Sequence, residues 1–152
     1  MNLRNALFGY ISGRFENEPA KAMLLSEDGL LVYEQAGGKR ASFSVSGDCL
    51  GRVRDILSQN MEELRQCAAE INHVPSALPP DGENCFIFGD LVIIDWDLTR
   101  WYLEEDRKKH PDYYSNSVKV ELTETRVRAV FDEICAVIEA DEKKMRYARL
   151  ML

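Results

Sequence analysis

The sequence predicts an α+β fold in which a mainly antiparallel sheet, built from hairpins, packs against two long amphipathic helices. Three tight-turn signals separate apolar runs, and tight turns join antiparallel neighbours because parallel strands need a crossover of about a dozen residues or more. Two long segments repeat apolar residues at three- and four-residue steps, which is typical of helices. A length of 152 residues suits a single domain, 1–152, that removes roughly 70% of its unfolded-state surface from water.

The turn signals predict three β-hairpins. Asp28-Gly29 stands between two apolar runs, and this dipeptide favours the positive backbone angles of a type I′ turn. Gly37-Gly38 precedes the stretch "ASFSV", in which apolar and polar residues alternate as in a half-buried strand. Gly89-Asp90 separates the runs "CFIF" and "LVIID". We therefore expect neighbouring strands to be joined by short reversals.

The first long helix is expected to begin after Ser46, a good N-cap, with Asp48 placed to interact with the positive end of the helix dipole. Its apolar positions form one stripe, namely Leu50, Val53, Leu57, Met61, Leu64, Ala68 and Ile71. The prolines at positions 75, 79 and 80 cannot continue a helix. Residues 73–84 are therefore interpreted as a Pro-rich surface loop.

The last third of the chain predicts one more strand and a terminal helix. "SVKVEL", residues 117–122, alternates like a half-buried strand, and Thr123 can cap a helix running nearly to Leu152, roughly 40 Å at 1.5 Å per residue. A small sheet is not that wide. The expected apolar face of this helix comprises Val127, Val130, Phe131, Ile134, Val137 and Ile138.

Two parts of the chain share a pattern. "VSGDCLGRVRDIL" and "LTETRVRAVFDEI" agree in their aliphatic, capping and acidic positions. This agreement hints at a (βββα)2 pseudo-repeat with halves 1–72 and 85–152, although any two capped amphipathic helices would share most of it.

Composition excludes several classes of protein. The net charge of −7 opposes binding to phosphate backbones, which depends on Lys and Arg displacing counterions; nucleic acid and anionic membranes are not expected partners. No apolar run approaches the roughly 18 residues that cross a bilayer, and no signal peptide is recognisable, so we expect a cytoplasmic protein. Cys49, Cys67, Cys85 and Cys135 form no CxxC pair and are interpreted as reduced residues with structural roles.

One motif carries potential chemistry. In "VIIDWDLTR", Val92 to Arg100, strand alternation places Asp95 and Asp97 on one face, about 7 Å apart. An apolar run followed by Asp-x-Asp-x-Thr resembles the first motif of the haloacid dehalogenase-like phosphatases. The resemblance, which covers about nine residues, implies that Asp95 is a phosphorylated nucleophile, that Asp97 is a general acid and that Mg²⁺ neutralises the phosphate. It also implies a parallel, doubly wound sheet.

A simpler interpretation treats the same motif as the polar end of a strand. The predicted hairpins disagree with a parallel sheet, and the 55 residues after Asp97 contain no recognisable partner motifs for phosphoryl transfer. On this interpretation Trp96 faces the core and both carboxylates end the strand in water. Thr99 then caps a short helix over residues 100–110.

We therefore expect a non-catalytic protein without a cofactor that binds another protein or a second copy of itself. Bacterial immunity proteins and secretion chaperones offer an analogy at the level of fold class only. The cationic end of the last helix either complements the helix dipole or docks on a partner. The partner-binding candidates are Met145, Tyr147, Ala148, Leu152, Trp101, Tyr113 and Tyr114.

Two alternatives stay open. The first is a Mg²⁺-dependent phosphatase of the haloacid dehalogenase-like type that uses Asp95 and Asp97 as catalytic and metal-binding residues. The second is a small-molecule binder in which aromatic side chains, several of them in the expected loop "HPDYYSN", line a pocket. Those aromatic residues are Trp96, Trp101, Tyr113 and Tyr114.

Overall fold

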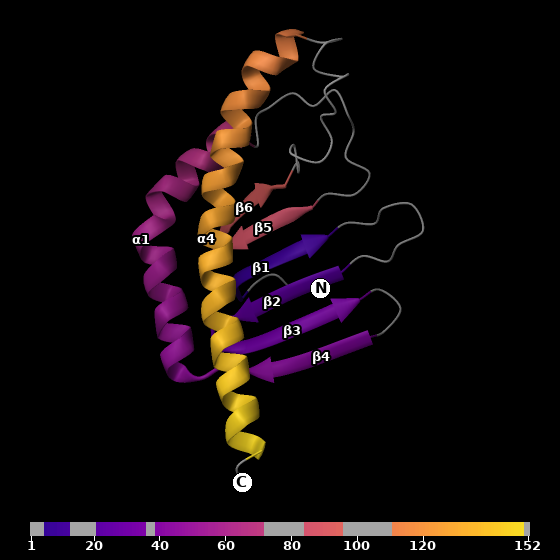
Figure 1. Cartoon of the computed structure of the whole chain (residues 1–152), viewed down its shortest axis with the longest axis vertical. Coiled ribbons are helices and arrows are strands. Elements are labelled where there is room, and N and C mark those ends of the chain that lie inside the picture. Colours follow the sequence, from indigo (N-terminus) through magenta and orange to yellow (C-terminus); the bar gives the residue numbers. More distant parts are fainter. Residues whose placement is uncertain (1–4, 13–20, 36–38, 72–83, 96–110, 151–152) are drawn as a thin grey trace.

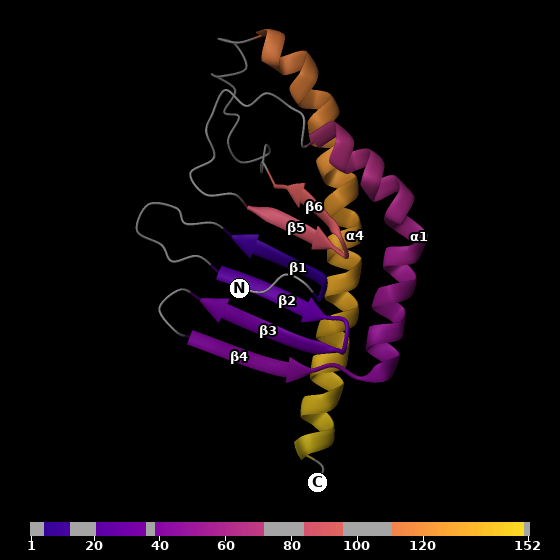
Figure 2. The same cartoon turned by 180° about the vertical axis from the view of Figure 1, so that it is seen from behind.

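A computed structural model describes residues 5–12, 21–35, 39–71, 84–95 and 111–150, and within the last range the side chains of residues 122–144. The described chain has an α+β fold with one six-stranded sheet and two long helices. Both helices lie on the same face of the sheet (Figures 1 and 2). The predicted fold class is confirmed.

All pairings within the sheet are antiparallel. The order across the sheet is β4-β3-β2-β1-β5-β6, so β1 lies between β2 and β5 and joins the strands that precede the first helix to the two that follow it. The strands are β1 (Ala6–Ser12), β2 (Lys21–Ser26), β3 (Leu30–Gln35), β4 (Lys39–Ser44), β5 (Cys85–Phe88) and β6 (Leu91–Ile94).

The predicted hairpins are present. Gly29, between β2 and β3, has a φ of 93°, and Gly89, between β5 and β6, has a φ of 63°; both values lie in the region that glycine adopts without strain. Strands β3 and β4 also pair antiparallel, although the Gly37-Gly38 turn itself lies outside the described residues.

Helix α1 (Gly47–Ile71) begins where the sequence predicts. The backbone N–H of Cys49 donates to the Ser46 side-chain oxygen at 3.1 Å, which is the expected N-cap hydrogen bond. The predicted apolar stripe faces the core, except that Leu50 and Met61 are only half-buried. The buried residues of this helix are Cys49, Val53, Ile56, Leu57, Leu64, Cys67, Ala68 and Ile71.

Helix α4 (Pro111–Leu150) corrects the sequence analysis. The strand predicted at residues 117–122 is wrong, because this segment is helical, and Thr123 lies within the helix rather than at its cap. A half-buried strand would bury Leu122, yet Leu122 is 64% exposed while Thr123 is fully buried. Proline is well tolerated in the first turn of a helix, where its missing N–H has no partner to lose, so α4 can begin at Pro111.

The predicted apolar face of the last helix is confirmed, with Phe131 only partly buried. The order of elements places four strands before α1 and two described strands before α4. This arrangement does not confirm a (βββα)2 repeat. Within the described residues, neither helix combines the length and the apolar character needed to cross a bilayer.

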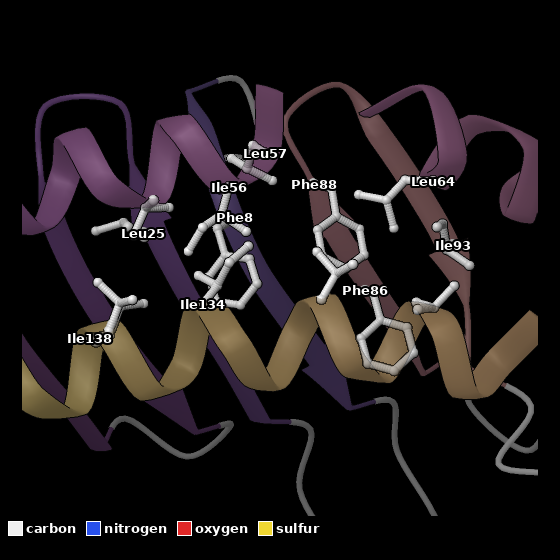
Figure 3. Close-up of a cluster of buried hydrophobic side chains, with 14 of the residues drawn as sticks. Phe8, Leu25, Ile56, Leu57, Leu64, Phe86, Phe88, Ile93, Ile134 and Ile138 are labelled. Carbon is white, nitrogen blue, oxygen red and sulfur yellow. The ribbon is translucent and has the colours of Figure 1, made fainter. Parts of the chain in front are cut away.

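The core lies between the sheet and the two helices, where side chains from both layers meet (Figure 3). The helices cover only one end of the strands (Figures 1 and 2). Leu31 in β3 is fully buried under them, whereas Tyr33, two residues further along the same face of the strand, is 40% exposed. The other end of β1 to β4 therefore extends beyond the helix layer.

Candidate functional site

Asp95 follows β6 directly and is buried, with a relative exposure of 6%. The Arg128 side chain on α4 places its Nη2 atom 2.9 Å from Oδ1 and 3.0 Å from Oδ2 of Asp95. The hydroxyl of Tyr10 on β1 donates to Oδ2 at 2.6 Å. The prediction that Asp95 ends its strand in water is therefore wrong; its carboxylate is the centre of a polar network that joins β6, β1 and α4.

Arg128 connects this network to further groups. Its Nε and Nη2 atoms lie 3.4 Å from Oε1 of Glu124, one helical turn earlier, and its guanidinium carbon lies 5.5 Å from the centre of the Phe86 ring. The contacts to Asp95 are shorter than those to Glu124, which makes Asp95 the principal partner. Glutamate followed four residues later by arginine is a spacing that places both side chains on one face of a helix.

The geometry around Asp95 favours a structural role over a catalytic one. A carboxylate that attacks phosphorus must present a free oxygen to the substrate, but the Asp95 side chain is 2% exposed and both of its oxygens accept hydrogen bonds. The antiparallel sheet also differs from the parallel, doubly wound sheet that the haloacid dehalogenase-like resemblance implies, so that expectation about the fold is wrong. Asp97 lies outside the described residues.

A second polar cluster joins the end of α1 to α4. The Thr123 hydroxyl donates to Oε2 of Glu70 at 2.7 Å. Arg126 lies 3.8 Å from a carboxylate oxygen of Glu63 and 4.0 Å from one of Glu70. Since the three charged side chains are about half exposed, the buried Thr123 contact is the part of this cluster that fixes the helix pair most firmly.

Three cysteine thiols, those of Cys49, Cys67 and Cys135, are held in their protonated form. Burial, assisted by the nearby Asp141 carboxylate, raises the pKa of Cys49 to about 11. Burial also raises the pKa of Cys135 to about 12, with help from Asp132 and Glu139, and raises the pKa of Cys67. Because the thiolate is the reactive species, these thiols are poor nucleophiles at neutral pH. In the described part of the chain, no group of three or more His, Cys, Asp or Glu side chains is arranged to hold a metal ion.

A groove lies where β1 to β4 extend beyond α4. It has a volume of about 520 Å³. Its lining combines apolar and aromatic side chains, Tyr10, Met23, Tyr33, Ala22 and Ala41, with the polar and charged residues Ser12, Lys21, Glu34 and Arg40. A mainly apolar hollow with a few polar groups is the usual form of a binding site.

Tyr33 is the most exposed large apolar side chain of this groove, which the sequence analysis did not identify. Burial raises the pKa of Tyr33, and the carboxylates of Glu142 and Glu139 on α4 together with Cys135 raise it further. The phenol is therefore neutral at physiological pH and offers one donor beside a flat ring. The only signal in the sequence was the presence of tyrosines at core-facing strand positions, where fully apolar residues are more usual.

Strand β4 forms one edge of the described sheet and borders the groove. The backbone N–H of Val45 donates to the Gly29 carbonyl at 2.9 Å. Because backbone groups alternate in direction along an antiparallel strand, those of Phe43 and Ala41 also face β3, whereas those of the even-numbered residues face outward. These outward residues are Arg40, Ser42 and Ser44, and all three are exposed.

The partner-binding candidates from the sequence fall in two groups. Tyr113 and Tyr114 belong to the helical backbone of α4, which corrects the loop expected at "HPDYYSN". Met145, Tyr147 and Ala148 belong to the last turns of the same helix, and the side chains of all five lie outside the described ones. Trp96, Trp101 and Leu152 also lie outside the described residues, as does the short helix expected over 100–110.

Comparison with known protein families, with curated proteins and with solved structures finds no match to this chain. Functional inference therefore depends on the geometry of the site alone.

Proposed function

We propose that this chain is a non-catalytic protein-binding module that receives a segment of its partner at the β4 edge and in the adjoining groove. The proposal is based on one observation: an exposed edge strand and a groove lie next to each other. Strand β4 presents outward backbone groups, and the groove beside it contains Tyr33, which is 40% exposed. We further place the protein in the cytoplasm, where reducing conditions keep cysteine side chains from forming disulfides.

The two features supply complementary kinds of recognition. An exposed sheet edge offers a row of hydrogen-bond donors and acceptors to an added strand, which gives affinity without dependence on sequence. The groove offers apolar contact area through Tyr10, Met23 and Tyr33, and aromatic side chains are frequent anchors of protein interfaces. Charges at Lys21, Glu34 and Arg40 can orient the partner.

Site-specific photo-crosslinking tests this proposal. A benzophenone side chain introduced at position 33 should give a covalent adduct of defined mass inside cells, whereas the same group at Gln59, an exposed residue of α1, should not. The adduct should disappear when Ser42→Pro is added, because this change removes an outward N–H from β4. Equal labelling at both positions, or an adduct that persists in the Ser42→Pro background, would reject binding at this site.

An activity assay tests the enzymatic alternative separately. The proposal expects no magnesium-dependent hydrolysis of p-nitrophenyl phosphate above the buffer rate. Turnover that is abolished both by Asp95→Asn and by a chelator, in protein that remains folded by circular dichroism, would replace the proposal with the phosphatase.

A further inference from the structure

We infer that the partner is a second copy of this chain, paired through β4 about a two-fold axis so that the last turns of each α4 lie over the groove of the other copy. This assignment names the partner of the site proposed above and therefore rests on that function. Three independent features point to it: the reach of α4, the symmetry of the edge and the distribution of charge.

Helix α4 crosses the whole sheet and continues past β4 (Figures 1 and 2). Asp141 fixes its position at this edge, because the carboxylate accepts a hydrogen bond from the Ser46 backbone N–H at 2.9 Å. From Asp141 to Leu150 the helix extends about 14 Å further at 1.5 Å per residue. That length equals about three strand spacings of 4.8 Å, which is the width of β4, β3 and β2 in a neighbouring sheet.

A two-fold axis perpendicular to the sheet brings this projecting segment to the groove. Such an axis keeps both helix layers on one face of a continuous sheet and reverses the strand direction of the second copy. The helix-covered end of one copy, marked by Leu31, then lies beside the uncovered end of the other, marked by Tyr33. Each α4 therefore projects over the strand ends that the partner's own helices leave exposed.

Strand β4 can pair with its own copy without conflict. Centring the axis on Ser42 places Arg40 opposite Ser44, so no like charges face each other. The outward backbone groups of both strands then meet, and Ala41 and Phe43 remain on the helix-bearing face of both copies. Small and polar residues at the crossing leave room for close approach of the two strands.

Charge also favours a second copy. Residues 143–152 contain four cations, Lys143, Lys144, Arg146 and Arg149, and no acidic residue, although the chain as a whole carries a charge of −7. Near the groove that would receive this segment, Glu139 and Glu142 are close enough to Tyr33 to act on its ionisation, while Glu34 in the lining is paired with Arg40.

The first test is the molar mass of the full-length protein, measured by sedimentation or light scattering over about 1 to 300 µM, a range that covers micromolar dissociation constants. We expect the mass of two chains, and one chain for Ser42→Pro. Proline at position 42 removes an N–H that faces the partner, not β3. The matched control is Ser42→Val, which keeps the N–H and should keep the two-chain mass. A two-chain mass for folded Ser42→Pro would overturn the inference.

Hydrogen exchange provides a test that needs no variant. The amides of Ser42 and Ser44 should be protected from exchange at high concentration and lose protection on dilution, because their partners belong to the other copy. Fast exchange of both amides in a protein of two-chain mass would overturn β4 pairing.

The tests separate this inference from the function on which it rests. A monomer at all concentrations that still forms the position-33 adduct with a different protein would overturn self-association and retain the binding site. A monomer with no adduct would reject both.

Discussion

Polar residues near the two edges of the sheet have different surroundings. Directly after β6, Asp95 is buried and bound by Arg128 and Tyr10, so its carboxylate is used within the fold. At β4, the outward-facing residues Arg40, Ser42 and Ser44 are exposed, and the groove beside them is open. The polar network beside β6 therefore serves the fold, whereas the exposed polar residues of β4 are the basis of the proposed partner site.

The largest expected effect is loss of the network beside β6. Asp95→Ala removes the partner of a half-buried guanidinium and of the Tyr10 hydroxyl, and we expect the free energy of unfolding to fall by about 2–3 kcal/mol. Urea denaturation followed by circular dichroism measures this change. Asp55→Ala, at an exposed position of α1, is the matched control and should change stability by less than about 0.5 kcal/mol.

A double replacement sharpens the same comparison. Asp95→Leu combined with Arg128→Leu should be less destabilising than the sum of the two single changes, because neither Asp95 nor Arg128 is left without the other. Loss of the contact between Arg128 and Glu124 occurs in both the single and the double variant and therefore cancels in the comparison. Additive losses would show that the two side chains act independently.

The next effect concerns the anchor of α4 near β4. Ser46→Ala removes both the N-cap of α1 and a hydroxyl that donates to Asp141, and we expect a loss of about 1–2 kcal/mol in the free energy of unfolding. Ser58→Ala, at an exposed position within α1, should have almost no effect. If the two substitutions were equivalent, the junction between β4 and α1 would not fix the helix layer.

Alkaline pH should weaken the helix layer close to the β4 edge. The pKa of Cys49 rises from 9.0 to about 11 on folding, so above pH 9 the unfolded chain releases this proton first and stability falls as pH rises toward 11. Relative to Cys49→Ala, the wild-type protein should lose about 1 kcal/mol more between pH 7 and pH 10. Parallel pH profiles of the two proteins would contradict this expectation.

The smallest effect concerns the charge of the projecting part of α4. Arg149→Glu should raise the dissociation constant of the two-chain assembly about two- to fivefold, the size expected for exposed ion pairs, and the effect should shrink at high salt. Sedimentation at two salt concentrations measures it. Arg65→Glu, an exposed position of α1 away from the β4 edge, is the control and should leave the constant unchanged.

The sequence allowed the local features of the fold to be predicted. Gly29 and Gly89 mark their hairpins because positive φ is a requirement of the turn itself, and Ser46 marks the start of α1 because an N-cap acts within three residues. The first part of α4 was missed because "SVKVEL" alternates over six residues like a strand. In the structure this part of the chain is helical, and Thr123 forms a hydrogen bond with Glu70, a residue 53 positions away along the chain.

The candidate site could not be predicted for a related reason. The partners of Asp95 lie 33 and 85 positions away along the chain, so nothing near "VIIDWDLTR" distinguishes a buried ion pair from a solvated strand end. The groove depends on where α4 crosses the strands, which fixes Leu31 as covered and Tyr33 as open. Both residues lie on the same face of β3, so the alternation along the strand predicts the same degree of burial for both.

Helix α4 is bound near both sides of the sheet, through Arg128 at one and Asp141 at the other. Asp141 follows Arg128 by 13 positions, a distance of about 20 Å along the helix, close to the width of the sheet. An insertion or deletion of a single residue in this interval would turn one anchor by about 100° relative to the other. Insertions and deletions in this helix should therefore be tolerated only at its two ends, and the number of residues between the two anchors should stay constant.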